Sequence, residues 1–434
     1  MEGPTPVSAL IHAATMVTAG VFLLIRSSGL YEFTPSVLNF ITTIGAATAF
    51  MAATSGLLQN DLKKVIAYST CSQLGYMVFA CGLSSYSLSL FHLSNHAFFK
   101  ALLFLSAGAV IHAISSEQDM RKLGGLLRLL PYTYAMFLVG SLALMGFPFL
   151  TGYYSKDLIL EVAASTTTTV GYYAYWLGII TAFFTAFYSF RLLNLVFYGT
   201  SRSPRTYLLQ GHELTPRMAL ALAALSLGSI FFGFLLRDLF VGLGTPVWIG
   251  VISQAPETTG AQLAGEFLVL NQKLTPLYGT VYSVGLLFFS EHFHRAELSR
   301  LYNYLPAVNL HRFLSSKWGF DTVYNRIVNQ PLLKGAYNIT FSLIDKGVLE
   351  VVGPTGGGLV AYRLGNLLSR VQTGRVYDYA AFILGAVLVA TLGVDYGFLF
   401  THLFETVQIP CTVMFLLAQP LESRAVYPTK LAVN

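Results

Sequence analysis

Residues 86–114 read YSLSLFHLSNHAFFKALLFLSAGAVIHAI. This mostly apolar segment is longer than the roughly 20 residues that cross a bilayer. Its middle carries His92, His96 and Lys100. At about 100° per residue, these three side chains fall within an arc of about 80° on one face of a helix. The segment therefore predicts a membrane-spanning helix with a line of protonatable groups along one side.

The rest of the chain also has the composition of a membrane protein. Of its 434 residues, 54% are hydrophobic and only 11% are charged, whereas about a quarter of the residues of a soluble domain are charged. The net charge of +6 is scattered, which indicates lipid headgroups, and not nucleic acid, as partners. We predict further spans near residues 7–25, 36–57, 63–82, 132–152, 167–198, 217–243, 276–292 and 379–401, with 405–418 as an interfacial or re-entrant candidate.

The line of ionisable groups in residues 86–114 needs a reason, because a charge inside a membrane costs roughly 2.5–3.5 kcal/mol on insertion scales. A neutral imidazole donates from one nitrogen and accepts on the other, and burial makes a lysine easier to deprotonate. The simpler alternative is three polar groups that satisfy one another inside a helix bundle. Three aligned groups that end in a lysine favour proton transfer over this alternative.

A second ionisable pair follows a predicted break in a span. Gly146, Pro148 and Gly152 interrupt one apolar segment, a pattern typical of a broken helix that lines a cavity. Lys156 and Asp157 come directly after it. They either serve the cavity or mark the loop at the helix end.

Three further ionisable residues, His12, Asp61 and Lys63, lie in or beside predicted spans. Two prolines precede His12, so this histidine fits either a structural kink or a functional intramembrane position. Asp61 and Lys63 flank a span, where charges more often mark the membrane edge.

Residues 316–372 depart from the spanning pattern. Charged residues become frequent there, while apolar residues keep helical spacing. This pattern predicts an amphipathic helix in the membrane plane, interrupted at Pro331 and at the glycine-rich run 353–358. The predicted fold class is therefore all-α: a polytopic transmembrane helix bundle of about nine or ten spans with broken helices, a long lateral amphipathic helix and a final anchoring span.

Several short stretches resemble subunit 5 of the proton-pumping NADH dehydrogenase, respiratory complex I. Residues 2–20, 61–77 and 92–100 are similar to the antiporter-like proton-channel segment of that family. Residues 153–157 resemble its terminal-lysine motif, and residues 317–324 resemble the start of its lateral helix. The resemblance extends from residue 2 to about residue 400.

The resemblance implies a proton path across the membrane. Lys100 would be its central lysine, and Lys156 would be the terminal lysine that exchanges with the outer aqueous side, with Asp157 as its acidic neighbour. The other implied participants are the relay histidines His12, His92 and His96, and Lys63 and Asp61 for proton input or helix pairing.

The resemblance also implies partners and a location. The chain has no phosphate-binding loop, dinucleotide fingerprint or cysteine cluster, so we expect no cofactor here. NADH, FMN, iron–sulfur clusters and quinone are expected in partner subunits. The expected setting is the mitochondrial inner membrane, as a multi-pass protein among lipids and other membrane-arm subunits, including antiporter-like ones. A bacterial plasma membrane is the alternative location.

The family carries an upstream glutamate and a first channel lysine that this chain lacks, so we expect a separate N-terminal fragment of the same subunit.

The expected domains are antiporter-like channel helices (1–243), a loop and additional span (244–315), the lateral helix (316–372), the anchor (373–402) and an extension (403–434). Two alternatives stay open: a subunit of a multi-subunit sodium–proton antiporter, and a purely structural membrane strap.

Overall fold

The structure is a computed structural model that describes residues 3–242, 247–248, 250–253, 264–293 and 305–395. Every regular element in these ranges is helical, which confirms the predicted all-α class. Five of the described helices are long and apolar enough on their own to cross a membrane. The contacts divide the chain into one unit up to Val328 and a second from Asn329, and each is described by itself. The predicted domain ranges stay predictions.

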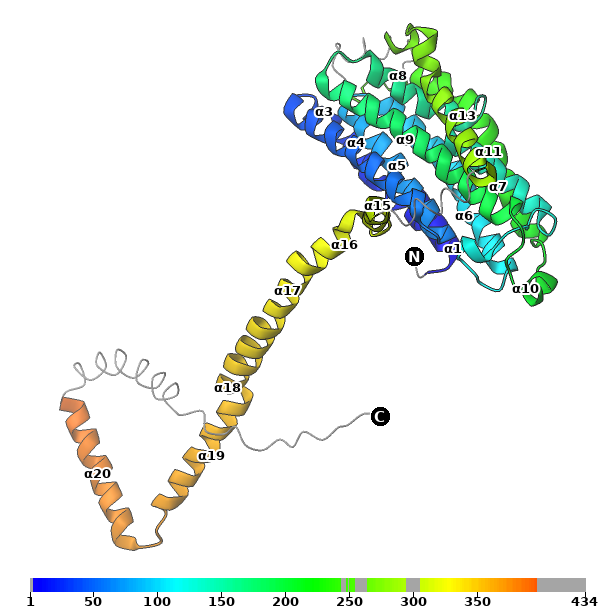
Figure 1. The fold of residues 1–434 in the computed structure, drawn as a ribbon. Coiled ribbons are helices and arrows are strands. Elements are labelled where there is room, and N and C mark those ends of the chain that lie inside the picture. The colour runs from blue at the N-terminus through cyan, green and yellow to red at the C-terminus, as the bar shows by residue number, and fades with distance from the viewer. Residues whose placement is uncertain (1–2, 243–246, 249, 254–263, 294–304, 396–434) are drawn as a thin grey trace. The chain divides into compact units, whose positions relative to one another are not determined.

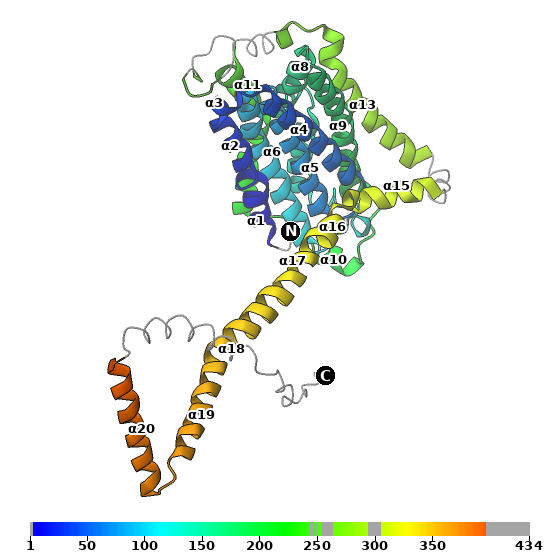
Figure 2. The same ribbon diagram turned by 90° about the vertical axis from the view of Figure 1, so that its left-hand side faces the viewer.

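The first half of the bundle contains most of the predicted spans. Its elements are α1 (Thr5–Val7), η1 (Ser8–Thr15), α2 (Thr18–Arg26), α3 (Ser28–Tyr31), α4 (Pro35–Leu58), α5 (Leu62–Gly82), α6 (Tyr86–Ala113), η2 (Met120–Lys122) and α7 (Pro131–Met145). The helices α4, α5 and α6 begin and end within a few residues of the predicted positions. They run side by side in the bundle (Figures 1 and 2).

Small residues bring α4 and α5 into backbone contact. A Cβ atom added to Gly75 of α5 would lie 2.6 Å from the backbone nitrogen of Ala49 in α4. One added to Gly45 of α4 would lie 2.5 Å from the backbone nitrogen of Phe79. Such close helix approach is typical of membrane bundles, where small residues replace the hydrophobic driving force between helices. The contact fixes the position of α5, whose polar face contributes to the site described below.

The predicted break is present and begins at Gly146, the first of the three residues that indicated it. The predicted span 132–152 is wrong at its end, because α7 stops at Met145. Gly146 ends the helix in the left-handed conformation, with φ of +82°, which glycine adopts without steric cost. The chain turns and resumes as η3 (Tyr153–Asp157), a π-helical segment, followed by α8 (Leu158–Ser165).

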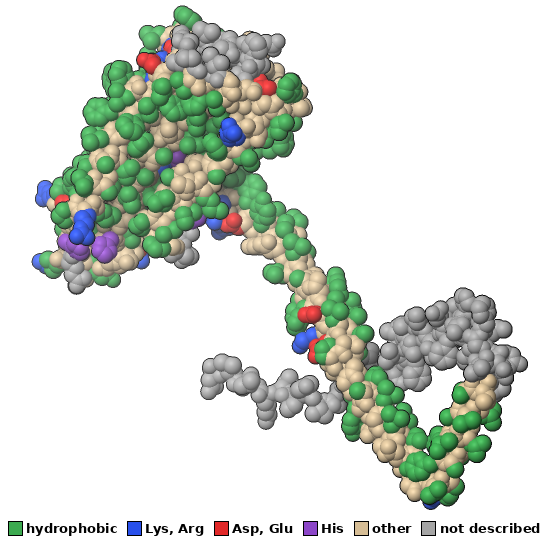
Figure 3. Space-filling model, turned by 180° about the vertical axis from the view of Figure 1, so that it is seen from behind, with side chains coloured by type: hydrophobic (Ala, Val, Ile, Leu, Met, Phe, Trp, Pro, Cys, Tyr) green, Lys and Arg blue, Asp and Glu red, His purple; other side chains and the backbone are tan. Residues whose placement is uncertain are grey.

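The remaining helices of the first unit complete the bundle around α6. They are α9 (Thr169–Leu193), η4 (Asn194–Tyr198), α10 (Arg205–Gln210), α11 (Pro216–Val241), α13 (Leu270–Phe293), α15 (Leu305–Ser315), η5 (Lys317–Gly319), α16 (Phe320–Val323) and η6 (Tyr324–Asn329). Large apolar side chains are exposed on the outer helices, among them Trp176, Phe234 and Tyr282. Figure 3 shows a bundle face covered mostly by hydrophobic side chains, as lipid contact requires.

The second unit is a long helical segment followed by a turned-back helix. Its elements are α17 (Gln330–Gly335), η7 (Ala336–Leu349), α18 (Glu350–Val352), α19 (Pro354–Val371) and α20 (Val376–Asp395). The predicted interruption at Gly353 is confirmed. The one at Pro331 is wrong, because the helix continues through it. The missing N–H of Pro331 falls where the π segment η6 gives way to α-helix.

The segment Lys317–Val371 and the apolar segment Val376–Thr391 meet at 114°. The predicted final span 379–401 is helical as far as Asp395. Its last residues, the 405–418 candidate and the 403–434 extension lie outside the described residues.

Candidate functional site

The line of ionisable groups predicted on α6 is buried at the centre of the bundle. The side chains of His92, His96 and Lys100 have no exposed surface. They follow one another at intervals of four residues, so each lies about 6 Å further along the helix axis. Burying three ionisable groups without partners is unfavourable, so their surroundings decide what they can do.

His92 joins three elements through its two ring nitrogens. Nδ1 lies 2.9 Å from Oγ of Ser155 in η3, and Nε2 lies 3.1 Å from Oε1 of Gln73 in α5. The Ser155 hydroxyl has a second acceptor, the backbone carbonyl oxygen of Thr151 at 3.3 Å. His92 is therefore held on both sides by groups whose hydrogen bonds can reorganise.

His96 has a different environment. Within the described part of the chain, neither of its ring nitrogens has a hydrogen-bond partner, and the same holds for both amide atoms of the adjacent Asn95. The ring packs edge-on against Phe99, with centroids 5.3 Å apart, and lies 6.2 Å from the His92 ring. Buried polar atoms almost always have a partner, often an ordered water. His96 thus offers two available nitrogens between His92 and Lys100.

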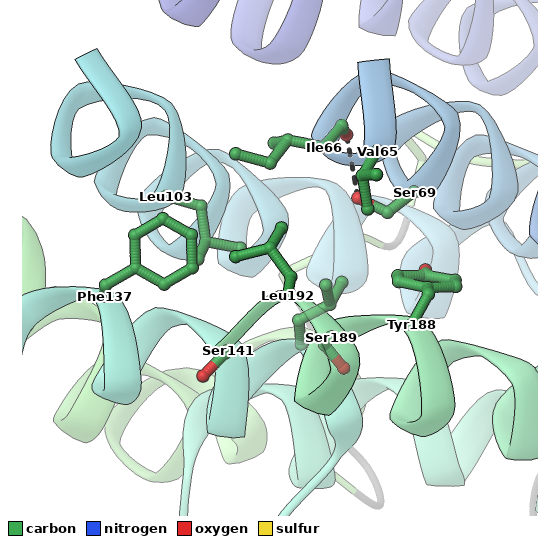
Figure 4. A pocket seen from close by; sticks show the side chains of 10 residues that line it. Val65, Ile66, Ser69, Leu103, Phe137, Ser141, Tyr188, Ser189 and Leu192 are labelled. Atoms are coloured by element: carbon green, nitrogen blue, oxygen red, sulfur yellow. Dashed lines mark hydrogen bonds between the residues drawn. The ribbon is translucent and has the colours of Figure 1, made fainter. Parts of the chain in front are cut away.

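Lys100 ends the line against α5. Its Nζ donates to the backbone oxygen of Ile66 at 3.2 Å and to the hydroxyl of Ser69. A small cavity of about 10 Å³, the space that about one water molecule needs, lies against these acceptors, and Ser141, Tyr188 and Ser189 contribute to its lining. Figure 4 shows α9 side chains approaching the cavity opposite Ser69. Hydroxyl groups and empty space beside a lysine provide a setting for water.

The break after α7 places Lys156 and Asp157 inside the protein. Their residues are 1% and 5% exposed, so they do not mark a surface loop. Nζ of Lys156 donates to the hydroxyl of Thr185 in α9 at 2.9 Å and lies 5.5 Å from the centre of the Tyr76 ring. Ser155, the partner of His92, directly precedes Lys156, so the α6 line continues to the broken helix.

Three of the predicted site residues lie apart from this line. His12 is exposed on η1. Lys63 is buried at the start of α5, where its Nζ donates to the backbone oxygen of Gly3 at 3.4 Å. Asp61 directly precedes the same helix end and forms an ion pair with Lys64. The structure therefore brings together His92, His96, Lys100, Lys156 and Asp157, and it leaves His12, Lys63 and Asp61 apart from them.

The sequence interpretation missed the contribution of α9. Thr185, Tyr188 and Ser189 recur at intervals of three and four residues within an apolar span, a polar stripe on one helix face. That spacing is the feature of the sequence from which a polar, site-facing side of α9 could have been predicted. Among the described residues, no group of three or more His, Cys, Asp or Glu side chains is arranged to hold a metal ion.

The fold and this buried line define an antiporter-like membrane protein, in which ionisable side chains cross a helix bundle at a broken helix. Comparison with known proteins supports the antiporter-like fold. The family model described as NADH:quinone oxidoreductase/Mrp antiporter, TM, matches residues 1–190. A solved structure of the Mrp complex from Dietzia sp. DQ12-45-1b is similar, with a TM-score of 0.56 and 27% identity over 90% of this chain and 38% of that one.

The most informative relatives are named NADH-ubiquinone oxidoreductase chain 5. The one from Phytophthora infestans is 51% identical over 88% of this chain and 58% of its own length. Those from Arabidopsis thaliana and Metridium senile are 50% and 51% identical, over 90% and 88% of this chain and 59% and 61% of their own lengths. The chain thus spans about three fifths of these relatives. Its first 190 residues match the NADH:quinone oxidoreductase/Mrp antiporter family model, and over most of its length the chain is similar to chain 5, in agreement with the resemblance of its motifs.

Proposed function

We propose that this chain translocates protons as a membrane subunit of NADH:ubiquinone oxidoreductase, complex I. In this proposal, protons move between Lys100 and Lys156 by way of His96 and His92. The observation that carries it is the hydrogen bond between His92 Nδ1 and Ser155 Oγ, because it connects the α6 line to the residue that precedes Lys156.

His92 accommodates both charge states with little rearrangement. In the neutral ring, the Nε2–H group donates to Gln73 Oε1, and Nδ1 accepts from the Ser155 hydroxyl. When the ring gains a proton, its Nδ1–H group donates to Ser155 Oγ. The hydroxyl then turns to its other acceptor, the carbonyl oxygen of Thr151. A side chain that must bind and release a proton needs such a neighbour.

His96 and Lys100 supply the preceding step. The deprotonated Lys100 amine accepts a proton, and its ammonium form passes one to His96 directly or through water. Since the His96 nitrogens lack protein partners among the described residues, no hydrogen bond has to break first. The direction of transfer, toward exchange with the outer aqueous side at Lys156, follows the family resemblance.

The remaining parts of the proposal come from the relatives. Their names place them in an NADH–ubiquinone oxidoreductase, so NADH oxidation, FMN, iron–sulfur clusters and quinone are assigned to partner subunits. The relatives come from eukaryotes, which supports the mitochondrial inner membrane as the location. Other membrane-arm subunits, lipids and a separate N-terminal fragment are the proposed partners, and the helical segment from Lys317 to Val371 is proposed to brace them.

The test compares Lys100→Ala with Lys122→Ala in the assembled complex in its native membrane. Lys122 is an exposed loop lysine paired with Glu117, so its loss should leave pumping unchanged. Lys100→Ala should allow NADH oxidation but reduce the number of protons moved per NADH. Unchanged pumping in Lys100→Ala would favour a structural strap, and a requirement for sodium would favour the sodium–proton antiporter alternative.

A further inference from the structure

Beyond Lys156 and Asp157, a group of charged side chains extends to one end of the bundle. It consists of Glu161 in α8, Lys273 in α13, Arg237 in α11 and Glu266, which precedes α13. Lys273 Nζ lies 3.8 Å from Glu161 Oε2 and donates to the backbone oxygen of Glu266 at 2.7 Å. Arg237 Nη2 pairs with Glu266 Oε1 at 2.7 Å. These contacts connect three helices that are distant in sequence.

Exposure increases steadily along this group. Asp157 is 5% exposed. The side chain of Glu161 is 15% exposed, that of Lys273 25%, that of Glu266 29% and that of Arg237 38%. Glu161 follows Asp157 by one helical turn, so the two carboxylates lie on neighbouring positions of one helix face. The charged groups therefore lead in short steps from the buried lysine to solvent.

The order of the helices shows at which end of the bundle these four charged residues lie. It lies near the last turns of α8 and α11 and the first turns of α13. Figures 1 and 2 show α8 at the end of the bundle opposite α10. Asp61, Lys63 and the ion pairs at residues 117–122 belong to the α10 end, where α5 begins and α6 ends. The charged group beyond Asp157 thus lies at the end of the bundle opposite Asp61 and Lys63.

The two acidic residues of the group have different environments. Glu266 has a close ion pair with Arg237 at 2.7 Å, the geometry of a structural tie. Glu161 lies in the apolar sequence Leu158–Ser165, and its lysine partner is at 3.8 Å, beyond hydrogen-bond distance. A largely buried carboxylate whose cation is not hydrogen-bonded to it is less stable when charged than one in a close pair, which suits a group that is repeatedly protonated.

We propose that Glu161 is the proton-carrying residue that follows Asp157, and that protons leave the chain between Glu161 and Lys273. In this step, a proton leaves the Lys156–Asp157 pair and forms an O–H bond at the Glu161 carboxylate, directly or through water. That O–H bond then breaks and gives the proton to water beside Lys273. No electron is transferred. This inference rests on the proposed function.

The test uses the assembled complex and measures protons moved per NADH oxidised. Glu161→Gln keeps the shape and hydrogen-bonding capacity of the side chain but cannot carry a proton. It should lose as much pumping as Lys156→Ala does, and Glu161→Asp should restore most of it. Glu266→Gln is the matched control, because it makes the same chemical change in the same group of charged residues but weakens the Arg237 pair, and it should pump normally.

Each outcome has a separate meaning. Normal pumping in Glu161→Gln overturns the inference, and so does an equal loss in Glu266→Gln, since the group would then be only a structural tie. Should Glu161→Gln fail to assemble, the charge-balanced double variant Glu161→Gln/Lys273→Met replaces it, with the same expected loss and the same refuting result. Normal pumping in Lys156→Ala would refute the proposed function itself.

Discussion

Replacing His92 separates hydrogen bonding from proton exchange, because glutamine preserves the first and abolishes the second. The imidazole has two partners, Gln73 and Ser155. In His92→Phe both bonds are lost, but the Ser155 hydroxyl keeps its bond to Thr151. The cost then falls on Gln73, whose amide nitrogen already lacks a partner among the described residues.

The expected magnitude follows from that difference. A buried acceptor left without a donor costs about 1–3 kcal/mol, so His92→Phe should reduce the stability and amount of the assembled complex. In His92→Gln, the new amide can donate to Gln73 Oε1. Its cost should stay near that of one ordinary hydrogen bond, about 1 kcal/mol. Pumping should be lost in both variants, because neither side chain can carry a proton.

The assay measures three quantities in membranes from each variant: the amount of assembled complex, its thermal midpoint after detergent extraction, and the protons moved per NADH. His112→Gln is the control, because His112 is an exposed histidine near the end of the same helix. A His92→Gln complex that assembles and pumps like the parent would refute the relay and leave His92 with a structural role.

Two further predictions concern the scaffold. Gly75→Ala places a methyl group 2.6 Å from the backbone of Ala49 and should lower stability by about 1–3 kcal/mol. The control is Gly285→Ala in α13, where the added methyl group meets nothing within 4 Å, so its stability should not change. Equal thermal midpoints of the two extracted variant complexes would contradict the close α4–α5 contact. In the loop before α7, hydrogen bonds from the Arg121 side chain lower the pKa of Asp119. Its stabilising contribution is therefore present at neutral pH and is lost as the pH falls through the folded-state pKa, below the usual value of about 4. Hydrogen exchange at residues 117–122 should rise on acidification, and Asp119→Asn should weaken that pH dependence; an unchanged dependence would contradict it.

The sequence predicted the parts of the site that depend on one helix. The spacing of His92, His96 and Lys100 defines a single face whatever surrounds it, and the structure places all three in the core. The break near Gly146 could be predicted for a similar reason, since glycine and proline act locally. The exact end of α7 could not, because several residues in that segment can end a helix.

Contacts between residues on different helices could not be predicted from the sequence. Ser155 and His92 are 63 positions apart, and no periodicity indicates that they touch. His12 shows another limit of the sequence, because an apolar span does not indicate which of its faces is buried in the protein, and the His12 side chain is exposed on η1. Glu161 was missed although its four-residue spacing from Asp157 was visible. A single acidic residue near a predicted helix end is more often a surface group.

The hydrogen-bond partners of the buried ionisable side chains suit the proposed path, in which each group must both accept and release a proton. Lys100 is held by a hydroxyl and a carbonyl, His92 by a hydroxyl and an amide, and Lys156 by a hydroxyl. A hydroxyl group donates or accepts as required, so it stabilises neither charge state strongly and leaves the proton free to move. A carboxylate beside Lys100 would instead hold the ammonium form in place.

Carboxylates enter only at the far end of the line. Among the described residues, Asp157 is the only acidic side chain in the fully buried set, and Glu161 follows it toward solvent. A positive charge is therefore most stable at the Lys156 end of the line, where an aqueous exit is also nearest. In the proposed path, this asymmetry favours transfer from Lys100 to Lys156 and release of the proton at α8, away from Asp61.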